Sequence, residues 1–264
     1  MITVFTPAYN RRCLLERAFN SLKEQKGFRD FEWIIVDDGS QDGTKEYILS
    51  LLEKSEAESL PFNIRYFYQD NGGKHRAFNR GIKEAKGDLF FVLDSDDKLP
   101  EDALALVNTI YQDIKADNTF AGLCGLDADF EGNIIGSGLP QEIIDDNSIR
   151  IRYNYGITGD MKEVFKTSVL KEFPFPEFDG EKFCPEILVW NRIAKRYKLR
   201  YINKVIYLAE YQPTGLSSKI TEIRLKSPKA TELTYAEMMS LEIPIKQRIK
   251  AFLNLWRFRI LSKL

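Results

Sequence analysis

The sequence has little cysteine, a single histidine and no long apolar segment. Its three cysteines, Cys13, Cys124 and Cys184, lie far apart and lack partners at metal-ligand spacing, so we interpret them as reduced thiols of a cytoplasmic protein. The single histidine, His75, excludes zinc sites that use several histidines. No apolar run reaches about 18 residues, and no basic segment followed by an apolar one opens the chain. These absences argue against secretion and against a membrane-spanning segment.

Neither sign of charge is in excess. The 264 residues contain 38 Lys and Arg against 39 Asp and Glu, a net charge of -1, which excludes a general attraction for nucleic acid. Hydrophobic residues make up 44% and charged residues 29%, as in an ordinary soluble globular protein. The length allows one large domain or two smaller ones.

Short β-rich runs alternate with helical periodicity over the first 115 residues. Strands are predicted at residues 2–6, 32–36, 64–68 and 89–93. Apolar faces at helical spacing occur within residues 14–22, 47–52, 78–85 and 104–114. This alternation predicts an α/β fold with a parallel sheet. Between residues 120 and 138 the pattern weakens, so mixed strands are expected there, followed by a helix at 186–197 and a strand at 200–208.

Polar loops follow each of the first four predicted strands, at residues 6–11, 37–44, 70–75 and 94–97. Ligands bind at the carboxyl ends of parallel strands, because loops and helix N-termini meet there. Taken singly, these loops also fit ordinary turn and capping chemistry. However, Asp94, Asp96 and Asp97 place three carboxylates within four residues, which repel one another unless solvent or a cation compensates them. A hard divalent metal ion is the natural partner.

The common nucleotide-binding motifs are absent. Neither G-x-G-x-x-G nor G-x-x-x-x-G-K-[ST] follows the first predicted strand, which argues against a nicotinamide dehydrogenase and against a P-loop phosphotransferase. Phosphate-binding charge is therefore expected from a metal ion near the fourth strand.

The four loops, in this order, resemble family 2 glycosyltransferases of the GT-A fold. The motifs that carry the resemblance are TPAYN at 6–10, VDDGSQDGT at 36–44, NGGKHRAFNRG at 71–81 and GDLFFVLDSDD at 87–97. The resemblance is strong over residues 1–115 and looser over 115–217. It implies a Rossmann-like, mostly parallel sheet flanked by helices, with mixed strands in the second half. Residues 1–217 would form one catalytic domain, with a nucleotide-sugar half (1–115) and an acceptor half (116–217), and residues 218–264 a C-terminal helical extension.

The resemblance also implies an activity and a donor site. The expected reaction moves a sugar from a nucleotide-diphosphate sugar, usually a UDP-sugar, to an acceptor hydroxyl with inversion. The family's first two loops hold the nucleotide base, and the fourth binds ribose and a Mn²⁺ or Mg²⁺ that bridges the diphosphate. The donor contacts carried over are Thr6, Pro7, Tyr9, Asp38, Asp94, Ser95 and Asp96. Asp96 is the leading metal ligand, supported by Asp94 and Asp97. Lys74 and His75, beside the glycine turn at 72–73, are candidates for phosphate contact.

The candidate catalytic base is Glu186. The family places an acid at the start of a helix of the form acid-x-x-x-aromatic-x-Arg-x-Ala, and residues 186–194, EILVWNRIA, fit that form with Glu where Asp is usual. An apolar face of Ile187, Trp190 and Ile193 is expected to anchor this helix. Competing acids nearby are Asp160, Asp179 and Glu181. The structural alternative is an acid that complements the helix dipole.

Two further features bear on the reaction. Residues 211–217, YQPTGLS, resemble the family's loop that closes over the diphosphate, although a polar turn also explains them. The Gln-x-x-Arg-Trp motif of the family's processive synthases is absent, which favours single additions over polymerisation, in polysaccharide or glycoconjugate synthesis. Two alternatives stay open: a nucleotidyltransferase, although its glycine-rich loop is missing from residues 6–11, and a non-catalytic nucleotide-sugar-binding protein.

The second half is expected to bind the acceptor, a carbohydrate or a lipid-linked saccharide. Side chains there that suit carbohydrate are Tyr153, Tyr155, Asp160 and Trp190. Residues 245–264 contain six basic residues and no acid, and Ile249, Phe252, Leu253, Trp256 and Ile260 lie at helical spacing. This segment is predicted to lie on an anionic membrane surface, at its inner face, or else to pack on the body or form a dimer contact.

Overall fold

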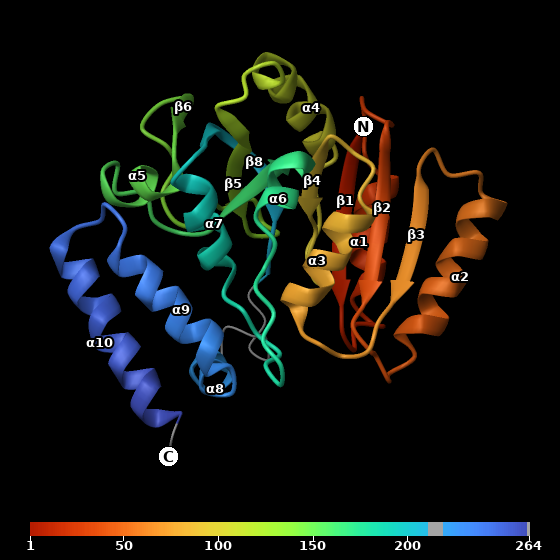
Figure 1. The fold of residues 1–264 in the computed structure, drawn as a ribbon. Coiled ribbons are helices and arrows are strands. Elements are labelled where there is room, and N and C mark those ends of the chain that lie inside the picture. The colour runs from red at the N-terminus through yellow and green to blue at the C-terminus, as the bar shows by residue number, and fades with distance from the viewer. Residues whose placement is uncertain (211–218, 263–264) are drawn as a thin grey trace.

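The computed structural model describes residues 1–210 and 219–262. Its centre is an eight-stranded sheet in the order β3-β2-β1-β4-β7-β5-β8-β6 (Figure 1). The first four strands are β1 (Ile2–Ala8), β2 (Phe31–Asp37), β3 (Asn63–Tyr68) and β4 (Leu89–Val92). All their pairings with one another are parallel, as the alternating pattern predicted.

Helices cover both faces of this part of the sheet. Along β1 and β2 successive side chains point to opposite faces, as strand geometry requires. Val4 and Trp33 pack with α1 (Leu15–Lys23), α2 (Thr44–Ala57) and α4 (Ala103–Ile114). Phe5 and Ile34 pack on the other side with α3 (Lys74–Glu84). Because β2 is buried on both faces, its sequence is an apolar run rather than an alternating one.

The second half adds four strands of mixed direction, which confirms the expectation of mixed strands. They are β5 (Phe120–Ala128), β6 (Ile143–Asp146), β7 (Met161–Lys166) and β8 (Lys198–Leu208). β7 lies between β4 and β5 and runs antiparallel to both, whereas β5 and β8 are parallel. The weak pattern that begins at residue 120 conceals a nine-residue strand, β5, which is buried throughout.

The helices of the second half are α5 (Ser148–Tyr153), α6 (Thr167–Glu172) and α7 (Glu186–Ala194). α7 ends three residues earlier than predicted. Its predicted apolar face is confirmed at Ile193, which is buried, but wrong at Ile187, which is 42% exposed, because the helix also packs through Leu188 and Val189. The first turn of α7 therefore keeps Glu186 and Ile187 partly exposed.

The predicted C-terminal helices form a layer beside α7. They are α8 (Ile220–Leu225), α9 (Pro228–Met239) and α10 (Ile245–Leu261), with α9 and α10 side by side (Figure 1). Arg192 of α7 and Glu237 of α9 form a two-pronged ion pair with contacts of 2.6 and 3.0 Å. In the part of the chain that the structure describes, no helix has the length and hydropathy needed to cross a membrane.

Candidate active site

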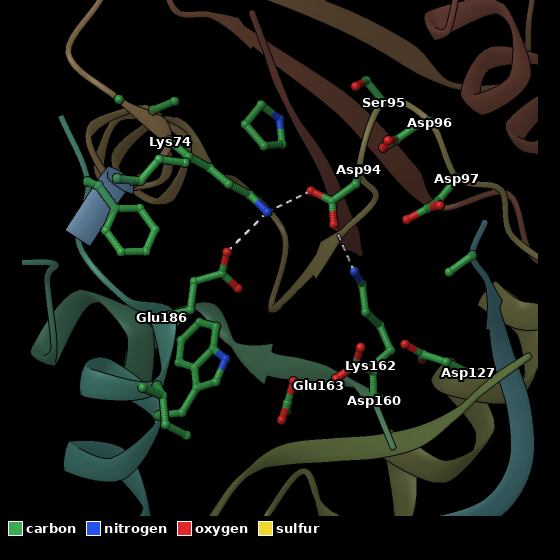
Figure 2. Close-up of a pocket in the computed structure, with 18 of the residues that line it drawn as sticks. Lys74, Asp94, Ser95, Asp96, Asp97, Asp127, Asp160, Lys162, Glu163 and Glu186 are labelled. Carbon is green, nitrogen blue, oxygen red and sulfur yellow. Dashed lines mark hydrogen bonds and ion pairs between the residues drawn. The ribbon is translucent and has the colours of Figure 1, made fainter. Parts of the chain in front are cut away.

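One cavity of about 1250 Å³ lies at the carboxyl ends of β1 and β4 and is walled by both halves of the chain. The nucleotide half contributes Tyr9, Lys74 and Asp94–Asp97, and the second half contributes β7, α7 and α9. Figure 2 shows the acidic and basic side chains of both halves pointing toward one another across it. The structure therefore brings most of the predicted site residues together.

Asp94 is held between two lysines. Its carboxylate oxygens lie 2.8 Å from Lys74 Nζ and 3.3 Å from Lys162 Nζ (Figure 2). Burial alone would raise the pKa of Asp94, but the two ammonium groups outweigh it and lower this pKa well below its ordinary value. Tyr207 supports the arrangement, because its ring lies 3.6 Å from Lys162 Nζ and its hydroxyl accepts a hydrogen bond from the Asp94 backbone N–H.

Lys74 also reaches Glu186, at 3.0 Å. Burial opposes the ammonium charge, yet the two carboxylates prevail and raise the pKa of Lys74 above its ordinary value. Lys74 is the first residue of α3 and Glu186 the first of α7, so two helix starts converge on one point. The ion pair holds the Glu186 carboxylate at the cavity, with 40% of its side chain exposed.

The other three acids considered as catalytic base have different surroundings from Glu186. Glu181 accepts hydrogen bonds from the backbone N–H groups of Lys229 and Ala230, at 2.8 and 3.0 Å, and so caps the first turn of α9. Asp179 is exposed and does not line the cavity. Asp160 lines the cavity on the β7 side. Of the four acids considered for the base, Glu186 is the one paired with Lys74.

The acids after β4 differ in their surroundings. Asp97 is buried; it accepts a hydrogen bond from the Tyr207 hydroxyl at 2.8 Å and one from the Glu210 backbone N–H at 3.3 Å. Burial and the nearby Asp94 raise the pKa of Asp97 to about 6. Asp96 is half-buried and lines the cavity, and no described residue makes a hydrogen bond or ion pair with its carboxylate. Ser95 is buried beside it and also lines the cavity.

Of the three carboxylates that follow β4, that of Asp96 has no partner among the described residues. Within residues 1–210 and 219–262, no three Asp, Glu, His or Cys side chains are grouped closely enough to hold a metal ion. Mg²⁺ is commonly bound by one or two carboxylates together with substrate phosphates and water. Asp96 fits that mode, whereas the carboxylates of Asp94 and Asp97 already have protein partners. The metal-ligand roles of Asp96 and Asp97 stay predictions.

The nucleotide-side residues are only partly in the cavity. Pro7 and Tyr9 line it. Thr6 does not: it is 0% exposed, and its hydroxyl donates to the Leu93 carbonyl at 2.7 Å and accepts from Trp33 Nε1 at 2.9 Å. Strand alternation turns Thr6 to the same face as Val4, away from the cavity. Thr6 thus links β1 to β2 and to the residue that follows β4, and its contact with a donor stays a prediction.

Asp38 lines the cavity, but its carboxylate already accepts hydrogen bonds from four protein donors. Its carboxylate accepts hydrogen bonds from the side chains of Gln69 and Asn71 and from the backbone N–H groups of Gly72 and Gly73. Four donors occupy the four lone-pair sites of a carboxylate. Asp38 thus fixes the loop that leads to Lys74, and its contact with the base stays a prediction. Glycine is required at 73, where φ is +99° and a Cβ would lie 1.9 Å from the Lys182 carbonyl oxygen.

Several charged residues that the motifs do not predict also line the cavity, among them Lys162, Asp127 and Glu163. Asp127 is 5% exposed, and burial raises its pKa to about 7 despite Lys162. Burial likewise raises the pKa of Glu163 to about 7. The only sequence signal was the presence of charge in otherwise apolar strand segments.

Of the remaining residues predicted for the site, some line the cavity and others do not. Tyr153, Asp160 and Trp190 line the cavity, but Tyr155 does not. His75 is buried in α3 and does not line it, so the structure gives no support to phosphate contact by His75. The predicted closing loop at 211–217 lies outside the described residues.

Comparisons with known proteins agree with this architecture. The sequence model described as "Glycosyl transferase family 2" matches residues 3–123. A GalNAc(5)-diNAcBac-PP-undecaprenol beta-1,3-glucosyltransferase from Campylobacter jejuni is 32% identical over 212 residues, 77% of this chain and 62% of that protein. Glycosyltransferase GlyA from Streptococcus pneumoniae is 24% identical over 263 residues, 96% of this chain and 35% of that protein. The chain thus spans about three fifths and one third of the length of these relatives.

Solved structures show the same fold. S. aureus TarS 1-349 has a TM-score of 0.66 and 20% identity, over 97% of this chain and 71% of that one. Mannosyltransferase PcManGT from Pyrobaculum calidifontis has a TM-score of 0.60 and 20% identity, over 98% and 73%. The family match over residues 3–123 and these relatives support a family 2 glycosyltransferase, and the predicted GT-A-type fold is confirmed.

Proposed function

We propose that this chain transfers a sugar from a nucleotide-diphosphate sugar, a UDP-sugar, to an acceptor hydroxyl with inversion at the anomeric carbon. The observation that carries the proposal is the Lys74 bridge, which joins the candidate donor acid Asp94 to the candidate base Glu186 in one cavity. The family match supports the reaction class. Solved complexes of S. aureus TarS with UDP and with UDP-GlcNAc suggest the donor class.

In this reaction Glu186 takes the proton of the acceptor hydroxyl while that oxygen forms its bond to the anomeric carbon. The bond from the anomeric carbon to the diphosphate oxygen breaks at the same time, and the diphosphate leaves with the electron pair. Lys74 and Lys162 place two positive charges at the cavity, where they favour an anionic group. Both lysines are held in place by Asp94, so little reorganisation is needed.

We also propose a divalent metal ion, Mn²⁺ or Mg²⁺, with Asp96 as its protein ligand and donor phosphate oxygens as further ligands. Such an ion, when bound, offsets charge on the leaving diphosphate. The Asp96 carboxylate supports this assignment, because it lines the cavity and pairs with no described residue. The solved complex of PcManGT with GDP-Man and Mn²⁺ supports a divalent ion in a protein of the same fold.

For the acceptor we propose a lipid-linked saccharide, extended by one sugar at a time in glycoconjugate or polysaccharide synthesis. The name of the Campylobacter jejuni relative, a glucosyltransferase for a polyprenyl-diphosphate-linked glycan, supports this choice. Trp190, Tyr153 and Asp160 give the cavity an aromatic and polar wall that suits sugar rings. An acceptor of this kind places the enzyme at the cytoplasmic face of a membrane.

A donor panel tests the function. The full chain is incubated with UDP-, GDP- and dTDP-sugars in Mn²⁺, Mg²⁺ or chelator, and the nucleotide products are separated. We expect nucleoside diphosphate from one UDP-sugar, dependent on the metal. Release of pyrophosphate would indicate a nucleotidyltransferase instead. Donor binding by calorimetry with no turnover, even with polyprenyl-linked saccharides added, would indicate a non-catalytic binding protein.

A further inference from the structure

Helix α10 has two apolar faces, of which only one is covered. Ala251, Leu255 and Phe258 are buried against α9, where the Phe258 and Tyr235 rings stack at 5.8 Å. On the opposite side lies an apolar row whose members are 45% to 68% exposed: Ile245, Ile249, Phe252, Leu253, Trp256 and Ile260. The 17 residues of α10 make this row roughly 25 Å long. The packing of α10 on the body therefore does not account for the row.

Positive charge borders the apolar row on both sides. At 3.6 residues per turn, Lys246, Lys250 and Arg257 lie along one edge, and Arg248 and Arg259 along the other. Residues 245–264 contain no acid. Arg259 pairs with Glu232 of α9 at 2.8 Å, whereas no ion pair to Lys246, Lys250 or Arg257 is found among the described residues. The first edge is thus a line of uncompensated cations beside exposed aromatic and aliphatic side chains.

We propose that the apolar row docks α10 flat on an anionic lipid surface. A helix that lies in the membrane interface inserts its apolar side chains below the headgroups and keeps Lys and Arg at headgroup level, as this arrangement allows. Trp256 and Phe252 supply aromatic rings, and Trp in particular favours the interface. Each basic residue near an anionic surface adds further attraction.

Charge favours lipid over a second copy of the chain. A two-fold contact through the same row would face one helix with an identical one, because such an interface uses the same patch on both subunits. The cationic edges would then approach each other, with no acid in either helix to pair with them. An anionic bilayer provides the opposite charge along the whole row.

The helix that carries the row packs on an element of the cavity wall. Met238 of α9 lines the cavity and also packs against the apolar cluster that Tyr235 forms with Ala251, Leu255 and Phe258 of α10. Ile223 of α8 and Lys226, which follows this helix, line the cavity as well. A membrane on the row would therefore be separated from the α9 wall of the cavity by α10 alone. The inference itself does not depend on sugar transfer and holds for the free protein.

Vesicle flotation with the full chain tests the inference in the absence of donor and acceptor. Vesicles contain phosphatidylcholine alone or phosphatidylcholine mixed with phosphatidylglycerol. We expect binding to the mixed vesicles that weakens with salt, and at least a tenfold loss of affinity in the double variant Leu253→Ser, Trp256→Ser. The double variant Lys246→Gln, Lys250→Gln should retain the row but lose the preference for phosphatidylglycerol.

Matched controls lie on α2, away from α10 in Figure 1. Leu49→Ser removes an exposed leucine and Lys45→Gln removes an exposed lysine, and both should bind vesicles as the parent does. Failure of the parent to bind mixed vesicles, or unchanged binding by the Leu253, Trp256 variant, overturns the proposal. So does a dimer in sedimentation equilibrium that this variant abolishes while vesicles remain unbound, because the row then belongs to a second copy.

Discussion

The first residue of α3, Lys74, and the first residue of α7, Glu186, form an ion pair at 3.0 Å although 112 positions separate them in the sequence numbering. Lys74 simultaneously contacts Asp94 at 2.8 Å. One ammonium group thus connects the end of β4, where the family resemblance places the donor, to the helix that carries the candidate base. The Lys74 side chain therefore holds the Glu186 carboxylate near Asp94, a contact that the local sequence does not reveal.

Replacing Lys74 tests this connection. Lys74→Gln removes the charge, leaves Asp94 with Lys162 alone and frees Glu186. We expect kcat/KM for transfer to fall about 10- to 100-fold, because the change removes a fixed positive charge from the cavity. Lys83→Gln, an exposed position on the same helix, is the control. Equal kinetics of the two variants would show that the bridge has no part in the reaction.

The metal assignment makes a separate prediction for Asp96. Asp96→Asn should weaken metal-dependent donor binding, measured by calorimetry with Mn²⁺ and with chelator, and change the melting temperature little. The reason is that no described residue uses this carboxylate for a structural contact. Asp102→Asn, at the exposed start of α4, is the matched control. Unchanged activity with unchanged Mn²⁺ dependence would remove Asp96 from the metal site.

The sequence predicts the first half of the fold well because its signals are local. Each of β1 to β4 is a short apolar run bounded by turn residues, and the helices between them have clear apolar faces. The placement of β7 between β4 and β5 has no local signal, since it depends on pairing with strands distant in sequence. For the same reason Lys162, which enters the site on β7, was not predicted.

The site was predicted in outline but not in its contacts. The motifs located Asp94, Asp96 and Glu186, and all three line the cavity. Thr6 shows what a motif does not predict. The motif locates the residue in the sequence, but strand alternation determines on which face of the sheet its side chain lies. The hydrogen bonds of Asp38 to the loop at 71–73 were not predicted either, since they depend on tertiary structure.

Glu181 should contribute to stability rather than to catalysis. It is buried and accepts from two backbone N–H groups at the start of α9. Glu181→Gln should lower the free energy of unfolding by about 1–3 kcal/mol, because the change removes the charge and leaves a buried amide badly paired. Urea denaturation measures this, with Glu53→Gln on the exposed face of α2 as control. Transfer well below the melting temperature should persist; if it is abolished while the fold is intact, Glu181 has a role in the reaction.

Asp127 should make stability depend on pH. Its folded-state pKa, about 7, exceeds the ordinary 3.8, so the folded protein binds more protons than the unfolded chain between these values. The groups that act on it are Lys162, which lowers its pKa, and Asp160, Asp97 and Asp94, which raise it. The stability associated with protonated Asp127 is therefore complete below the ordinary pKa of 3.8 and is lost as the pH rises through about 7.

Asp127→Asn removes this titration. We expect the variant to gain about 1–3 kcal/mol relative to the parent between pH 5 and pH 8, measured by urea denaturation at each pH. Asp129→Asn is the control, because hydrogen bonds from Asn133 lower the pKa of Asp129 and leave it ionised throughout that range. A difference between Asp127→Asn and the parent that stays constant with pH would contradict the raised pKa.

The final prediction concerns Glu186. Glu186→Gln should retain donor and metal binding and lose transfer by about 10²- to 10⁴-fold, the usual contribution of a general base. The amide has nearly the same size and can stay at the start of α7, but it cannot accept the proton of the acceptor hydroxyl. The loss should appear in kcat, with little change in donor affinity, because the proton moves only during the chemical step.

Four comparisons make this assignment specific. Asp179→Asn, on an exposed side chain that does not line the cavity, should transfer at the parent rate. Glu186→Asp keeps the carboxylate but shortens it by one methylene, so it should recover part of the activity lost in Glu186→Gln. Because Lys74 contacts the Glu186 carboxylate, Glu186→Gln in a Lys74→Gln background should cost less than in the parent if the two residues act together. Parent-like transfer by Glu186→Gln, with loss of transfer in Asp160→Asn, would move the base to the β7 side of the cavity.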